Sequence, residues 1–160
     1  MKNSYTRIIA ALCSMTMLWL MASCYSSLSY NDAIQKNISR VDDPDRHPEA
    51  RFIADAASYN MLATEMAKEA IQSGYSASLV SLAKENLEQH EEMTKDLKKI
   101  ARRERMVLPA EMSDDHDKLL AELKSADKGD FDRTYVRILS DISSEDSEKF
   151  AEMATEAKSE

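Results

Sequence analysis

Two histidines and one aspartate are the side chains of this sequence best suited to hold a metal ion together. His90 and His116 fall on the apolar stripes of two expected helices, and Asp146 falls on an inward flank of a third. Imidazole and carboxylate groups are common ligands of zinc and copper. The pattern therefore allows a zinc, copper or iron site inside a helical bundle. The alternative, which we favour, is that each imidazole packs at a bundle end and forms a hydrogen bond with a carbonyl or a carboxylate.

The residue pattern does not support other catalytic sites. A ferritin-type di-iron centre needs a Glu-x-x-His motif on each of two helices, because residues three apart share one inward face. Leu87 stands three residues before His90, and Ser113 stands three residues before His116. Neither histidine fits the motif. The chain also has no glycine-rich phosphate loop, and we expect neither enzyme activity nor a cofactor.

Cys24 stands at the end of a segment typical of protein export. Lys2 and Arg7 precede an uncharged, apolar run from Ile8 to Met21, and an Ala-Ser pair then leads to Cys24. This ending resembles the lipobox of bacterial lipoproteins, in which the chain is cut before a cysteine that carries lipid. We therefore predict a signal peptide over residues 1–23 and lipid attachment at Cys24. An uncleaved membrane anchor and an ordinary secretory signal are the alternatives.

Charge and cysteine content exclude several functions. The formal net charge is −8, and removal of residues 1–23 takes away two cations and no acid, so the charge becomes −10. An acidic protein does not bind nucleic acid through a general electrostatic field. Cys13 lies inside the predicted signal and Cys24 would carry lipid. No thiol is then left for a disulfide or for catalysis.

A basic cluster near the end of the second expected helix is a further candidate for binding. Its members are Lys95, Lys98, Lys99, Arg102, Arg103 and Arg105. These cations could meet phosphate head groups of a membrane. They could instead stabilise the negative end of the helix dipole, which is the interpretation that we favour.

Four amphipathic helices are expected to position these residues. Apolar side chains recur at helical spacing over residues 48–73, 77–105, 114–126 and 131–157. Gly74 and Gly129 end or separate the helices, and Ser76 and Ser113 are suited to cap the helices that follow them. Only two glycines and three prolines occur in the whole chain. This composition is typical of helical proteins.

Short connections between amphipathic helices favour antiparallel neighbours. We therefore predict an all-α fold, an up-down four-helix bundle over residues 48–158 with a short third helix. Residues 24–47 are polar and lack helical periodicity. They are predicted to form a flexible tether, with an average reach of roughly 25 to 30 Å, between the lipidated cysteine and the bundle.

Residues spread over all four helices recur at the intervals of a known family. They are Phe52, Ala57, Glu65, Ala70, Leu82, Ala83, His90, Leu97, Ala101, Leu108, Pro109, His116, Leu123, Phe131, Asp132 and Tyr135. Over about residues 50 to 155 this pattern resembles the bacterial envelope family catalogued as domain of unknown function 4142, often labelled predicted outer membrane protein. The resemblance implies a ferritin-like bundle and carries no established activity.

Two positions depart from the pattern of that family. Its members commonly have Asp-His in the second helix, where this chain has Gln89 and His90. They also tend to have a histidine in the fourth helix, at the position of Ser143. A histidine site shared by relatives would therefore be incomplete here.

The sequence favours a non-enzymatic function in the cell envelope. We expect a lipid-anchored helical bundle on the outer membrane, facing the periplasm, that acts as a binding or structural module. Its expected partners are the membrane, through the lipid, and another envelope protein, but not nucleic acid. The alternative is a metal-binding, ferritin-like protein that uses His90 and His116.

Overall fold

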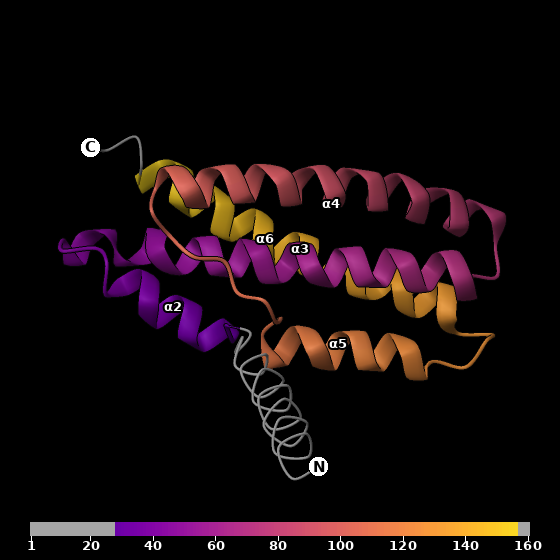
Figure 1. The fold of residues 1–160 in the computed structure, drawn as a ribbon. Helices are drawn as coiled ribbons and strands as arrows, with labels where there is room; N and C mark the ends of the chain where they lie inside the picture. Colours follow the sequence, from indigo (N-terminus) through magenta and orange to yellow (C-terminus); the bar gives the residue numbers. More distant parts are fainter. Residues whose placement is uncertain (1–27, 157–160) are drawn as a thin grey trace, which may run out of the picture.

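The computed structural model of the protein describes the backbone of residues 28–156 and the side chains of residues 28–144 (Figure 1). The helices in this range are α2 (Tyr30–Ile38), the 3-10 helix η2 (Pro44–Arg46), α3 (His47–Ser73), α4 (Ala77–Arg103), α5 (Asp114–Ser125) and α6 (Phe131–Glu156). The described chain contains no strand, which confirms the predicted all-α class. None of these helices is long and apolar enough to cross a membrane. The predicted signal peptide and Cys24 lie outside the described residues.

The helices α3 to α6 agree with the four predicted segments to within two residues at each end. The predicted caps are also present. The Ser76 hydroxyl accepts a hydrogen bond from the backbone N–H of Leu79 at 3.2 Å, and the Ser113 hydroxyl accepts one from the N–H of His116 at 3.3 Å. Each serine thereby satisfies an N–H group that has no partner inside its own helix.

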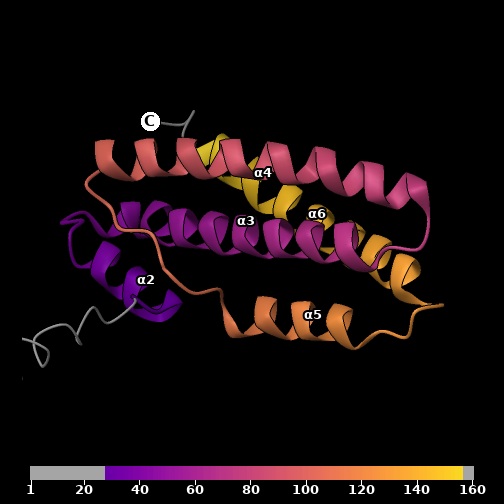
Figure 2. The same cartoon turned by 45° about the vertical axis from the view of Figure 1, so that its right-hand side comes forward.

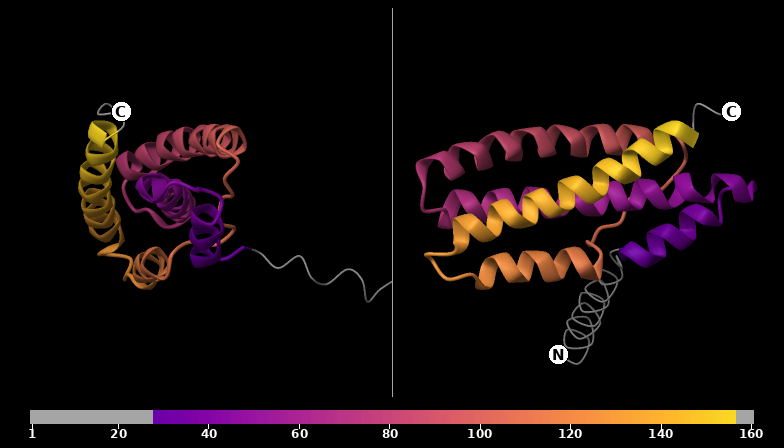
Figure 3. Two further views of the ribbon diagram at one scale, coloured as in Figure 1. Left: turned by 90° about the vertical axis from the view of Figure 1, so that its left-hand side faces the viewer. Right: turned by 180° about the vertical axis from the view of Figure 1, so that it is seen from behind.

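The central helix of the fold is α3, which lies between α4 and α5 while α6 crosses it obliquely (Figures 2 and 3). Its buried residues are Ala50, Ile53, Ala54, Ala56, Ala57, Ser58, Asn60, Leu62, Ala63, Met66, Ala67 and Ala70. These positions surround the helix axis, whereas the sequence suggested a single apolar face. Alanine makes this possible, because small side chains let neighbouring helices approach from several sides at once.

The predicted four-helix bundle is not confirmed, because the described residues contain a fifth α-helix, α2, which covers part of α3. The 12 residues of α5 span about 18 Å, whereas the 27 residues of α3 span about 40 Å. On the side where α5 lies, the first half of α3 is covered by α2, which runs antiparallel to it (Figure 1). The short fifth helix thus fills the space that the short α5 leaves open.

Buried hydrogen bonds fasten α2 to the rest of the protein. Asn37 is fully buried, and its amide donates to the carbonyl oxygens of Val107 at 2.9 Å and Ala50 at 3.3 Å. The Asn37 side-chain oxygen accepts a hydrogen bond from the N–H of Val107 at 2.7 Å. The Tyr30 hydroxyl also donates to the carboxylate of Asp55 on α3. The prediction of a flexible tether over residues 24–47 was therefore wrong for residues 30–38, because specific long-range partners make up for their low apolar content.

The two glycines offer a matched pair of substitutions. A Cβ atom added to Gly74 would lie 2.5 Å from the carbonyl oxygen of Ala70, which is part of the backbone and cannot rotate away. A Cβ atom at Gly129 would meet nothing within 4 Å. We expect Gly74→Ala to lower the free energy of unfolding by about 1 to 3 kcal/mol and Gly129→Ala to leave it nearly unchanged. Urea unfolding of both variants measures this, and equal effects at the two sites would contradict the close contact at Gly74.

Candidate functional site

His90 belongs to a closed hydrogen-bond network between α4 and α3. Its Nδ1 atom lies 2.9 Å from the side-chain oxygen of Asn60, which can only accept, so Nδ1 carries the proton. The Asn60 amide donates to the hydroxyl of Thr94 at 2.6 Å, and that hydroxyl donates to the carbonyl of His90 at 2.9 Å. The ring of Tyr59 stands edge-on to the imidazole, with 5.7 Å between ring centroids. His90 thus joins two helices through a buried polar contact.

His116 makes the corresponding contact between α5 and α3. Its Nδ1 atom lies 2.7 Å from the hydroxyl oxygen of Ser58, which is fully buried. The same hydroxyl accepts a hydrogen bond from the backbone N–H of Ser113 at 2.8 Å. Ser58 therefore fixes the first turn of α5 against the central helix. The sequence did not single out Ser58 or Asn60, because a serine or an asparagine inside an alanine-rich helix carries no local signal of its partner.

The two histidines approach α3 from different sides. Ser58 and Asn60 are two residues apart on this helix, and each residue advances about 100° around the axis, so their side chains point roughly 200° apart. The partners of these side chains, His116 and His90, lie on α5 and α4, which flank α3. The expectation that both imidazoles face one shared core was therefore wrong.

The remaining candidate ligands do not complete a site in the part of the chain that the structure describes. Asp146 lies in α6, but its side chain is outside the described side chains. Among residues 28–144, no three His, Cys, Asp or Glu side chains are grouped closely enough to hold a metal ion. The arrangement of His90 and His116 is that of helix-joining polar contacts.

The burial of His90 predicts that the stability of the protein depends on pH. Burial lowers the pKa of His90 below the ordinary value of 6.5. The folded state then binds a proton at His90 less readily than the unfolded state. The contribution of His90 to the free energy of unfolding is therefore fully present above pH 6.5. It is lost as the pH falls from 6.5 toward the lowered pKa. We expect a smaller free energy of unfolding at about pH 5.5 than at about pH 7.5. His90→Gln, which can still donate to Asn60, should lose less stability over this range in urea titrations; an equal loss would rule out His90 as the titrating group.

Asp132 and Tyr135 fix the start of α6. The Asp132 carboxylate accepts the backbone N–H groups of Tyr75 and Ser76, each at 2.9 Å. These hydrogen bonds hold the pKa of Asp132 below its usual range. The hydroxyl of Tyr135 accepts a hydrogen bond from the Asn86 amide at 3.2 Å and so links α6 to α4. Asp132 thus fastens α6 to the segment between α3 and α4, and Tyr135 fastens it to α4.

The members of the basic cluster on α4 divide into two sets. Lys95, Lys99 and Arg103 form ion pairs with carboxylates on the same helix or at its end, at 2.7 to 2.8 Å. Arg102 and Arg105 form no ion pair with any described carboxylate and line a hollow of 510 Å³ at the end of α4. Lys98, one turn before Arg102, also forms no ion pair with a described carboxylate, so the charge of the cluster is only partly balanced on this helix.

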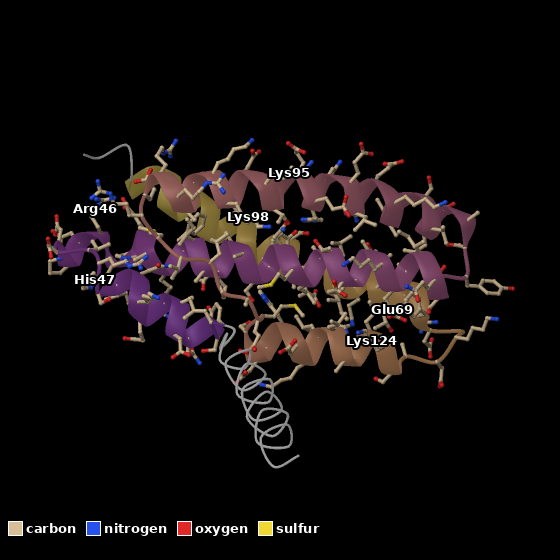
Figure 4. The ribbon with its side chains drawn as sticks, viewed as in Figure 1. Arg46, His47, Glu69, Lys95, Lys98 and Lys124 are labelled. Carbon is tan, nitrogen blue, oxygen red and sulfur yellow. The ribbon has the colours of Figure 1, made fainter. Side chains whose placement is uncertain are left out.

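Two hollows lie at opposite ends of the molecule. The hollow at the end of α4 is on the side where Figure 4 shows Arg46 and His47. The other, of 590 Å³, lies where α3 and α5 end, and Figure 4 shows Glu69 of α3 and Lys124 of α5 beside each other there. The second hollow carries charges of both signs and therefore favours neither anions nor cations.

Comparison with protein families identifies the helical body. The model of one family, described as Domain of unknown function (DUF4142), matches residues 39–160. The chain belongs to the DUF4142 family. This confirms the resemblance seen in the spacing of the helix residues. No match was found among curated proteins or among solved structures. The match to DUF4142 begins after the last residue of α2, so this helix precedes the family domain and packs against it.

Proposed function

We propose that the protein is a non-enzymatic binding or structural module of the cell envelope, held at the outer membrane by lipid on Cys24 and facing the periplasm. The export-type sequence before Cys24 supports the location. Membership of DUF4142 is consistent with a molecular activity that is unknown. The acidic charge of the chain argues against nucleic acid as the partner.

The proposal that the protein is not an enzyme rests on the hydrogen bonds that its buried polar side chains form. His90 bonds to Asn60, His116 bonds to Ser58, and Asn37 bonds to backbone groups on two segments. General acid or base catalysis needs a titratable group within hydrogen-bond reach of a substrate. The histidine contacts join helices, which is the behaviour of a rigid scaffold.

The location is tested by labelling cells that produce the full chain with a radioactive fatty acid. We expect label in the wild-type protein and none in Cys24→Ala. The variant should also leave the outer-membrane fraction. An unlabelled wild-type protein would refute lipid attachment at Cys24.

The molecular activity is tested with the full chain purified in a mild detergent. Elemental analysis after equilibration with zinc, copper and iron should show no stoichiometric metal, and cross-linking in intact cells should capture an envelope protein. Stoichiometric metal that disappears in both His90→Ala and His116→Ala would favour the metal-binding alternative instead. Reproducible turnover of a substrate, lost in His90→Gln, would refute the proposal altogether.

A further inference from the structure

A hollow lined by three arginines lies where α4 ends against the segment that follows α2. Its volume is 510 Å³, and its lining consists of Arg40, Ala101, Arg102, Arg105 and Met106. This volume is within the range of small-ligand sites. We propose that this hollow binds a phosphate group, carried either by a lipid head group or by a free phosphate anion.

The last turn of α4 directs Arg105 into this position. The N–H of Met106 donates to the carbonyl of Ala101 at 2.8 Å, and the N–H of Arg105 donates to the carbonyl of Arg102 at 3.3 Å. This pair of bonds is the Schellman ending of a helix, in which glycine usually occupies the position of Arg105. Arg105 has a φ of 56°, the only positive φ among the described residues other than glycine. The side chain of Arg105 thus takes a position where glycine would fit with less strain, which is consistent with a role for its guanidinium.

Arg40 reaches the same hollow from a distant part of the chain. Its Nη1 atom donates to the carbonyl oxygen of Arg105 at 3.0 Å. A guanidinium has five N–H donors in a fixed plane, so this bond orients Arg40 and leaves further donors available. Arg102 lies in the last turn of α4, and Arg105 follows the end of that helix; both line the hollow. Three guanidinium groups therefore line the hollow from two segments of the chain.

The charges in the hollow have no counter-ion among the described residues. Arg46, Arg103, Arg133 and Arg137 each form an ion pair. Arg40, Arg102 and Arg105 form none within residues 28–144, and no carboxylate lines the hollow. Of the acids near these arginines in the sequence, Glu104 pairs with Arg103, and Asp43 accepts the backbone N–H of Asp45.

This arrangement suits a phosphate group better than other anions of the cell. Planar guanidinium groups bind phosphate oxygens through paired hydrogen bonds, which strengthens and orients the contact. Ala101 and Met106 are mostly buried and give the hollow an apolar floor that the carbon part of a phosphate ester could contact. The competing explanation is that the arginines only stabilise the negative end of the α4 dipole.

The site is tested with the full chain, labelled with ¹⁵N-arginine and held in neutral detergent micelles, by following the Nε–H signals of its arginines. One titration adds inorganic phosphate, with sodium chloride at equal ionic strength as the reference. A second replaces part of the detergent by an anionic phospholipid such as phosphatidylglycerol. We expect the signals of Arg40, Arg102 and Arg105 to move together and to saturate in at least one titration.

Arg105→Gly is the decisive variant, because glycine suits a positive φ and the fold should be retained. We expect it to weaken binding by about tenfold, which is the usual effect of removing a charged hydrogen bond. Arg133→Gln removes one arginine charge from α6, at the opposite end of the molecule, and should leave binding unchanged.

The outcomes separate the two sources of phosphate and the competing explanation. Saturation with inorganic phosphate alone identifies a free anion as the ligand, and saturation with the phospholipid alone identifies a head group. Either result supports the site. The absence of saturation in both titrations would refute the proposal, as would unchanged binding in Arg105→Gly. The arginines would then serve only to cap the helix.

Discussion

Replacing Asn37 by alanine is expected to destabilise the protein by about 3 to 5 kcal/mol, because all three hydrogen bonds of a fully buried side chain are lost together. The side chain of Asn37 is fully buried and bonds to the carbonyl groups of Ala50 and Val107 and to the N–H of Val107. In the variant the buried Ala50 carbonyl and the half-buried groups of Val107 lose their side-chain partner. A loss of this size is a large share of the 5 to 15 kcal/mol that typically stabilises a domain.

The measurement is urea unfolding of the full chain in parallel with Asn31→Ala. Asn31 lies on the same helix and is exposed, so its removal should change the free energy of unfolding by less than about 0.5 kcal/mol. Hydrogen exchange should also show faster exchange of the α2 amides in Asn37→Ala. Similar stability of the two variants would mean that α2 does not depend on Asn37 for its position.

Replacing Tyr135 by alanine is expected to lower stability by about 3 to 5 kcal/mol, because it leaves a large cavity in the core. Tyr135 is 1% exposed and is the largest fully buried side chain among the described residues. It packs in the main apolar cluster with Leu62, Leu123 and Ile138. Tyr135→Phe removes only the hydrogen bond to Asn86 and should lose about 0.5 to 1.5 kcal/mol.

The neighbouring residue supplies the control for this effect. Val136 is 54% exposed, so Val136→Ala should alter stability by no more than about 0.5 kcal/mol. Thermal or urea unfolding of the three variants gives the ranking. An equal loss in Tyr135→Ala and Val136→Ala would contradict the packing of α6 against α3.

Helix positions could be predicted from the sequence because their signals are local. Ser76 and Ser113 begin helices and Gly74 follows the end of another, and each of these residues acts within one turn. The apolar repeat then fills the interval between two such signals. This is why α3, α4, α5 and α6 were expected at nearly their observed bounds.

The position of α2 could not be predicted from its own residues. Apart from Asn37, only Ala33 and Ile34 are fully buried in this helix, which is too little for a periodic apolar pattern. Its stability comes from Asn37 and Tyr30, whose partners are 70 and 25 residues away at Val107 and Asp55. Such long-range pairs leave no trace in a window of neighbouring residues.

For the same reason, the sequence predicted the orientation of the two histidines but not their partners. The apolar repeat correctly placed His90 and His116 on inward faces of their helices. Whether two inward faces meet depends on the third helix between them, where Ser58 and Asn60 select opposite sides. That choice rests on a two-residue offset in α3, which becomes meaningful only when both partners are known.

Docking of α2 also shortens the linker between the proposed lipid anchor and the folded part of the protein. Between Cys24 and Ser29, where the helix is capped, only five residue steps remain, and a fully extended chain of that length reaches about 18 Å. The helical domain would then lie close to the lipid head groups. Release of α2, as expected in Asn37→Ala, would lengthen this linker as far as η2. The helical domain could then move several times farther from the bilayer. The hydrogen bonds of one buried asparagine would thus set the largest distance between the helical domain and the bilayer.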